Sequence, residues 1–185
     1  MTRTELTQYL ADFLRVSAFK DYAPNGLQVE GKAEIRTIVT GVTACQALID
    51  EAIRLKADAI LVHHGFFWKN EPEVITGMKQ RRIKALLKHD ISLFGYHLPL
   101  DAHPMLGNNA TLGRQLGIID AEAIEEVAQG LLWRGKLDLA VSASEFSHTL
   151  ENALGRAPLH IGDRDAKIQH VAWCTGGAQD YIDVA

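Results

Sequence analysis

The stretch RTIVTGVTACQALIDEAIRLKADAILVHH, residues 36–64, places one amphipathic segment between two apolar runs. The runs at 36–42 and 58–64 are rich in aliphatic and β-branched residues, which predicts two strands. The segment at 45–57 spaces its apolar residues along one face of a helix. A strand, a helix and a second apolar strand are typical of a βαβ unit in a parallel sheet that is buried on both faces. This stretch therefore predicts an α/β fold.

The same alternation of helix-like and strand-like segments continues on both sides of this stretch. Upstream, the sequence predicts an amphipathic helix over 1–16 and a loop that leads into a strand over 21–31. Downstream it predicts a helix, a strand, a helix, a strand or hairpin, a helix and a short strand, over 77–90, 91–97, 108–117, 131–141, 142–155 and 158–162. We expect Asn108 or Asn109 to cap the helix at 108–117.

The C-terminal segment 168–185 resembles 35–52 in the order and spacing of a strand, a glycine-containing turn and a helix. This likeness predicts two related halves on mainly parallel sheets, with a first half over 1–120 and the start of a second over 121–185. The chain ends before a strand corresponding to 58–64, so we expect it to be truncated, with an incomplete second half.

Composition excludes several classes of protein. The chain has 185 residues, of which 47% are hydrophobic, and a formal net charge of -4, so nothing suggests disorder and no basic field would attract nucleic acid. The basic run at 79–89 is most simply the solvated face of an amphipathic helix. Cys45 and Cys174 are too few for a disulfide framework and fit a reducing compartment. With neither a signal peptide nor an apolar run of transmembrane length, we expect a cytoplasmic protein without a membrane partner.

Histidines end two of the predicted strands. His63 and His64 close the strand at 58–64, and His97 closes the next one, shortly before Asp101 and His103. Parallel α/β sheets bind ligands at the carboxyl ends of their strands, so we expect these side chains to share one rim if the strands are neighbours.

Imidazole and carboxylate ligands suit zinc, iron, manganese or nickel, and this mixture does not choose among them. Adjacent residues on a strand point to opposite faces, so His63 and His64 can turn toward one centre only if the backbone bends, which Gly65 permits. The same arrangement also suits two metals a few ångströms apart, bridged by Asp101.

Other interpretations stand beside the metal site. A single histidine at a strand end is more often a hydrogen-bonded core residue, and His103 would then only cap the turn at Pro104. Phe66, Phe67 and Trp68 offer a wall for a purine or pterin-like ring, or they bury at a domain or subunit interface. The remaining histidines are interpreted as surface or core residues: His89, His148, His160 and His170.

Four segments in combination resemble the NIF-three-like family, whose members are described as GTP cyclohydrolase I type 2 homologues. They are DYAPNGLQVEG, the stretch from VTGV to FFWK, GYHLPLDAHPMLGNNA and VAWCTGGAQDYID, and they run through the whole chain. The resemblance implies a three-layer αβα fold of two related halves, in the short form without an inserted middle domain. It also implies a dinuclear metal centre and assembly into a homohexameric ring.

The resemblance assigns roles residue by residue. The metal ligands of the first half fall on His63, His64 and Asp101. His97 matches a histidine beside the metals, where it would either support the ligands without binding metal or donate and accept a proton. Asn25 and Gly26 match a loop near the same cleft. The family's remaining ligands are a His and a Glu in an HHxxxE-type motif, and this chain finishes before that motif. Either the sequence is a fragment, or the protein binds metal weakly or through a partner chain.

Two functions follow from these expectations. The first is a metal-dependent hydrolase of the GTP cyclohydrolase type 2 kind, with two divalent metal ions per full-length subunit and a small-molecule substrate such as a nucleotide. The second is a non-catalytic metal-binding, regulatory or assembly protein that uses the same ligands.

Overall fold

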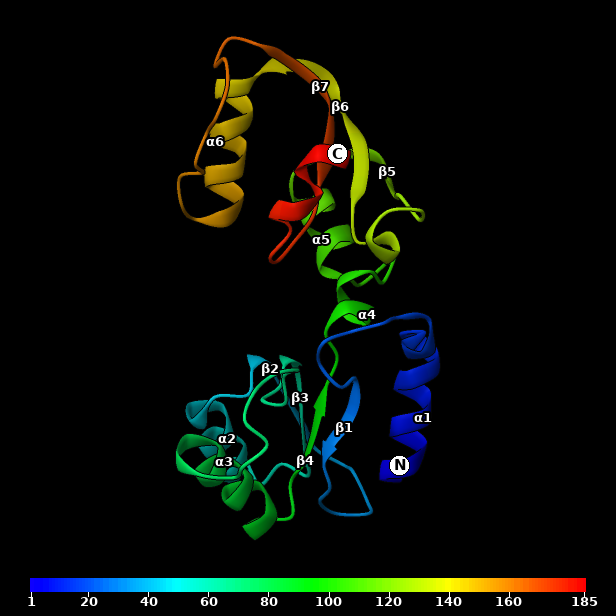
Figure 1. The fold of residues 1–185 in the computed structure, drawn as a ribbon, viewed down its shortest axis with the longest axis vertical. Helices are drawn as coiled ribbons and strands as arrows, with labels where there is room; N and C mark the ends of the chain where they lie inside the picture. Colours follow the sequence, from blue (N-terminus) through cyan, green and yellow to red (C-terminus); the bar gives the residue numbers. More distant parts are fainter. The chain divides into compact units, whose positions relative to one another are not determined.

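The computed structural model describes residues 1–185, which form two compact units, Met1–Leu100 and Asp101–Ala185 (Figure 1). Both units combine helices with a sheet, so the predicted α/β class is confirmed. The division at Leu100 falls before the expected boundary at 120, and the proposed relation between two halves stays a prediction. No helix has both the length and the apolar content needed to cross a membrane.

The first unit is built on a four-stranded sheet. Its strands are β1 (Gly26–Val29), β2 (Ile38–Thr43), β3 (Ala59–His64) and β4 (Ser92–Gly95), in the order β1-β4-β3-β2. Strands β2, β3 and β4 run parallel, as the βαβ pattern predicts, whereas β1 adds to β4 antiparallel. The carboxyl ends of β3 and β4 are therefore neighbours, and the predicted histidines lie at these ends.

Helices cover both faces of this sheet, as Figure 1 shows for α1 on one side and α2 and α3 on the other. Their bounds are Arg3–Phe13, Gln46–Arg54 and Gly77–Lys88. Alternate residues of β3 enter different cores, because successive strand side chains point to opposite faces. Ile60 packs in the core with α2 and α3, and Ala59 packs in the core with α1. The first unit thus has the expected three layers.

The second unit carries a three-stranded sheet in the order β5-β6-β7, with β5 (Ile119–Ala123), β6 (Trp133–Ser142) and β7 (Lys167–Trp173). Both pairings are antiparallel, so the expectation of mainly parallel sheets holds only for the first unit. The helical segments of this unit are α5, α6 and two short 3-10 helices, over Asn108–Gln115, Ala143–Leu154, Ala128–Gly130 and Gln179–Val184. The short helix α4 (Leu98–Asp101) lies where the two units meet in the sequence.

Two local predictions for this unit are wrong. No strand forms over 158–162, where Leu159 and Ile161 are 89% and 87% exposed and have no strand to pair with. The N-cap of α5 is Gly107, and neither Asn108 nor Asn109 caps it. The Asn109 amide is instead fully buried, and it donates to the carbonyl of Leu131 and accepts from the backbone N–H of Thr175. Both contacts are with residues distant in sequence, which a capping pattern cannot indicate.

Candidate metal centre

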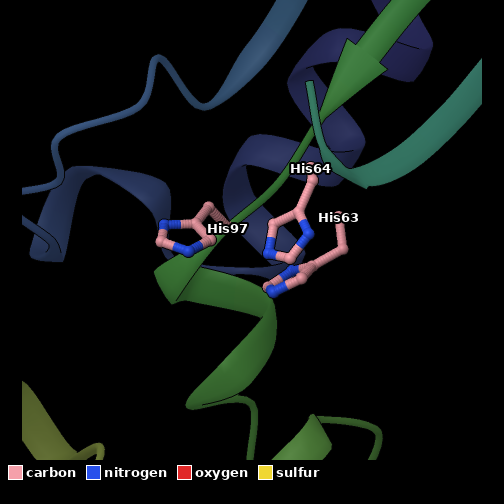
Figure 2. Close-up of side chains that lie close together, drawn as sticks. All are labelled: His63, His64 and His97. Atoms are coloured by element: carbon pink, nitrogen blue, oxygen red, sulfur yellow. The ribbon is translucent and has the colours of Figure 1, made fainter. Parts of the chain in front are cut away.

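Three histidines from two adjacent strand ends meet in the first unit (Figure 2). His63 and His64 end β3, and His97 follows β4. Each ring offers one nitrogen, and these three nitrogens lie within 4.8 Å of one another. The sequence prediction that these strand ends bring the imidazoles together is confirmed.

His63 and His64 point to the same place although they are consecutive. Their ring centroids are 4.3 Å apart, and the centroid of His97 lies 5.0 Å from that of His63. The ring of His63 is also fixed from behind, because its Nδ1 lies 3.0 Å from the carbonyl oxygen of Tyr96. The strand pairing with β2 ends at His64, opposite Thr43, so the side-chain alternation of a regular strand stops there.

Gly65, the glycine after the pair, lies next to the side chain of Gln28. Gly65 is not among the residues with positive φ. A Cβ atom on Gly65 would overlap the side-chain amide of Gln28, so the absence of a side chain on Gly65 makes room for that amide. A Cβ on Gly95 would lie 2.5 Å from Nε2 of the same amide. The Gln28 amide therefore occupies a slot beside Gly65 and Gly95, where neither glycine has a side chain in the way.

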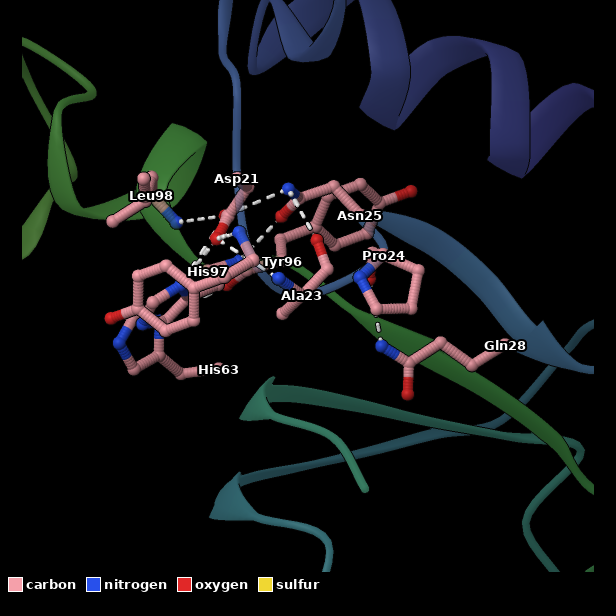
Figure 3. Close-up of polar contacts among 10 residues, drawn as sticks. Asp21, Ala23, Pro24, Asn25, Gln28, His63, Tyr96, His97 and Leu98 are labelled. Atoms are coloured by element: carbon pink, nitrogen blue, oxygen red, sulfur yellow. Dashed lines mark hydrogen bonds and ion pairs between the residues drawn. The ribbon is translucent and has the colours of Figure 1, made fainter. Parts of the chain in front are cut away.

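His97 is held by the loop that precedes β1 (Figure 3). Its ring Nδ1 lies 3.0 Å from Oδ1 of Asp21, and its backbone N–H donates to Oδ1 of Asn25 at 2.7 Å. The Asn25 amide also donates to Asp21 at 2.9 Å. The loop that carries Asn25 thus contacts His97, and the network adds Asp21, which the sequence reasoning missed.

The charge of Asp21 follows from its surroundings. Burial favours the neutral carboxyl, but hydrogen bonds from Asn25, His97 and the backbone N–H groups of Leu98 and Ala23 outweigh that effect and lower the pKa of Asp21. The carboxylate is thus ionised at neutral pH, directly behind the third imidazole.

Aromatic rings surround the histidines. Tyr22 and Trp68 each meet His97 edge-on, with centroid distances of 5.0 and 5.3 Å. Beside them lies an open hollow of about 500 Å³, which is lined by Asp21, Tyr22, Ala23, Pro24, Phe67, Trp68, Lys69, Glu71, Glu73, Ile75 and Lys79. Of the three expected aromatics, Phe66 is instead buried in the core of the first unit. The hollow has the aromatic wall and mixed charges that suit a planar polar ligand.

Asp101 and His103 belong to the second unit. The Asp101 carboxylate accepts a hydrogen bond of 2.6 Å from the Asn108 amide. The assignment of Asp101 as a metal ligand stays a prediction. His103 Nδ1 accepts from the backbone N–H groups of Met105 and Leu106 at 3.2 and 3.1 Å, which agrees with the interpretation that it caps a turn.

The donor set of the cluster fits a first-row divalent metal, because imidazole nitrogen is a ligand that zinc, iron and nickel share. His63 and His97 moreover place Nδ1 against an oxygen, as metal-binding histidines do when a second group orients the ring.

A comparison with known families matches residues 1–185, the whole chain, to the family described as Duf34/NIF3 (NGG1p interacting factor 3). The chain belongs to the Duf34/NIF3 family. This confirms the resemblance drawn from the four sequence segments.

Relatives within the family are close in sequence. A protein of Salmonella typhimurium described as GTP cyclohydrolase 1 type 2 homolog is 56% identical, and the match covers 100% of this chain and 74% of the relative. The protein of the same description from Escherichia coli (strain K12) is 55% identical over the same shares.

Solved structures of the family agree with the fold. The structural genomics target ybgI, of unknown function, matches with a TM-score of 0.90 at 53% identity, over 99% of this chain and 73% of that one. The protein TTHA1606 of Thermus thermophilus matches with a TM-score of 0.84 at 32% identity, over 100% and 74%.

Proposed function

We propose that this chain is a metal-binding protein that acts as a metal-dependent hydrolase on a nucleotide or related heterocycle. The observation that carries the proposal is the cluster of three imidazoles beside an aromatic hollow in the first unit. The relatives described as GTP cyclohydrolase 1 type 2 homologs support a purine nucleotide as the first substrate to test.

In this proposal each residue of the first unit has a chemical role. His63 and His64 would hold metal through their ring nitrogens. A divalent metal bound there supplies Lewis acidity and lowers the pKa of a water ligand. His97 would accept a proton at the reacting centre and return it to the leaving group. Tyr22 and Trp68 would seat the planar ring of the substrate at the mouth of the hollow.

Further parts of the proposal rest on sequence resemblance alone. They are Asp101 as a bridging ligand, two metal ions in each full-length subunit, a homohexameric ring and a cytoplasmic location. Asp101→Asn should lower metal content if that assignment is right.

The first experiment is elemental analysis of the chain loaded with zinc, iron or manganese and then desalted. We expect bound metal in the wild-type chain and its loss in the double variant His63→Ala/His64→Ala. His89→Ala is the matched control, because His89 is an exposed histidine of the same unit, at the end of α3. Equal metal content in the double variant and the control would contradict the assigned site.

The second experiment separates a hydrolase from a non-catalytic metal-binding protein. The metal-loaded chain is screened with nucleotides, pterins and phosphoesters, alongside His97→Ala. A hydrolase predicts turnover that His97→Ala abolishes while metal content stays. Metal retention with no turnover of any substrate would favour the non-catalytic alternative.

A further inference from the structure

We propose that Asp21 is a positioning residue, which fixes His97 in the tautomer with a proton on Nδ1 and leaves Nε2 as the ring nitrogen with a free lone pair. The inference rests on the proposed function and deepens it, because it names the group that makes His97 ready to accept a proton. It rests on the hydrogen bonds of one loop and one strand end in the first unit.

The proton between Asp21 and His97 can be assigned from the other contacts of the carboxylate. Each carboxylate oxygen already accepts two hydrogen bonds from groups that can only donate at that point. Oδ1 accepts from the backbone N–H groups of Tyr22 and Ala23, and Oδ2 from the Asn25 amide and the backbone N–H of Leu98, at 2.7, 3.1, 2.9 and 3.0 Å. Neither oxygen has room for a proton, so the hydrogen in the contact with His97 belongs to Nδ1.

The orientation of the Asn25 amide strengthens this assignment. Its oxygen faces the backbone N–H of His97, which is a donor, and its nitrogen faces the Asp21 carboxylate, which is an acceptor. Only this orientation satisfies both contacts. The same loop therefore holds both the main chain and the ring of His97. The side chains of His97 and Asp21 are only 8% and 3% exposed, which leaves little access for competing water.

His63 reaches the same tautomer by an independent contact. Its Nδ1 faces the carbonyl oxygen of Tyr96, which can only accept, so Nδ1 carries the proton there as well. Two of the three clustered imidazoles thus have Nδ1 held against an oxygen acceptor, with a proton on that nitrogen. Metal-binding and proton-accepting histidines commonly show this arrangement, in which a carboxylate or carbonyl holds the other ring nitrogen.

The test is long-range ¹H–¹⁵N NMR of the histidine rings in the uniformly labelled full chain without metal. In the neutral ring of wild-type His97 we expect the proton on Nδ1 and not on Nε2. In Asp21→Asn the side chain can donate as well as accept, so we expect the second tautomer to appear. Asp58→Asn is the matched control, because Asp58 also accepts from two backbone N–H groups in this unit but lies away from the histidines. It should leave the His97 signals unchanged.

Two results would overturn the proposal. One is a wild-type His97 with its proton mainly on Nε2, a measurement that needs no variant and does not depend on how well Asp21→Asn folds. The other is an Asp21→Asn chain, folded by its backbone amide spectrum, whose His97 tautomer equals that of the wild type. Because the spectra are recorded without metal, these failures are distinct from failure of the proposed function, which a wild type that binds no zinc would reveal.

Discussion

Gly65→Ala tests whether the slot for Gln28 beside the histidine pair is as tight as the structure indicates. An added methyl would overlap the Gln28 amide, which must then turn out of the slot and lose its hydrogen bond of 2.8 Å to the carbonyl of Pro24. That bond is worth about 0.5–1.5 kcal/mol, so we expect Gly65→Ala to destabilise the first unit by about 1 kcal/mol. Gln28→Ala removes the amide that the methyl would meet. In a chain that already carries Gln28→Ala, Gly65→Ala should therefore change the stability of the first unit by almost nothing.

The control is Gly31→Ala, because the atoms that its methyl would meet are backbone atoms of Asp90 and Ile91 and cannot turn away. We expect it to cost about 3 kcal/mol with or without Gln28→Ala. Native-state hydrogen exchange of the amides of β3 and β4 reports the stability of the first unit by itself. If Gly65→Ala and Gln28→Ala are additive in this double-mutant cycle, the two side chains do not compete for space and the description of the slot is wrong.

Three further outcomes are expected. Ile49→Ala removes a side chain with 0% exposure from the core beneath α2. It should lower the free energy of unfolding, measured by urea denaturation, by about 2–5 kcal/mol, and a loss below about 1 kcal/mol would mean that this core is loosely packed. Ser142→Ala removes the capping box of α6 and should cost about 1 kcal/mol, seen as faster amide exchange in that helix, whereas unchanged exchange would show that the cap contributes nothing. Hydrogen bonds from Lys32 and from backbone N–H groups lower the pKa of Asp58 despite its burial. The ionised carboxylate therefore stabilises the fold fully above the unfolded pKa of about 3.9, and this stabilisation is lost as the pH falls through the lower folded pKa. The difference in unfolding free energy between wild type and Asp58→Asn should therefore be constant near neutral pH and shrink in acid, and a difference that grows in acid would refute the assignment.

The parts of the fold that follow a repeating pattern could be predicted from the sequence. The strands around 38–43 and 59–64 and the helix between them are buried on defined faces, so their apolar spacing reports their structure directly. The same reasoning located the three histidines, since parallel neighbouring strands bring their carboxyl ends together.

The remaining features depend on contacts that sequence spacing does not show. Strand β5 has the sequence IDAEA and is largely exposed, and it is a strand because β6 lies beside it. Asp21 stands 76 positions before His97, and nothing near it in the sequence indicates its partner. The turn-forming residues up to Gly26 indicate a loop. Its contact with the end of β4 depends on the pairing of β1 with β4, which the spacing of residues does not show.

That pairing has a consequence for the order in which the site can form. Strands β2 and β3 are joined by a single helix, so their pairing closes a short span of chain at a low cost in entropy, and β3 ends in His63 and His64. His97 can be fixed only when β4 is paired with β3 and β1 is paired with β4, because Asp21 and Asn25 lie just before β1. The contact between Asp21 and His97 therefore requires both pairings, and it ties the geometry of the site to the folding of most of the first unit.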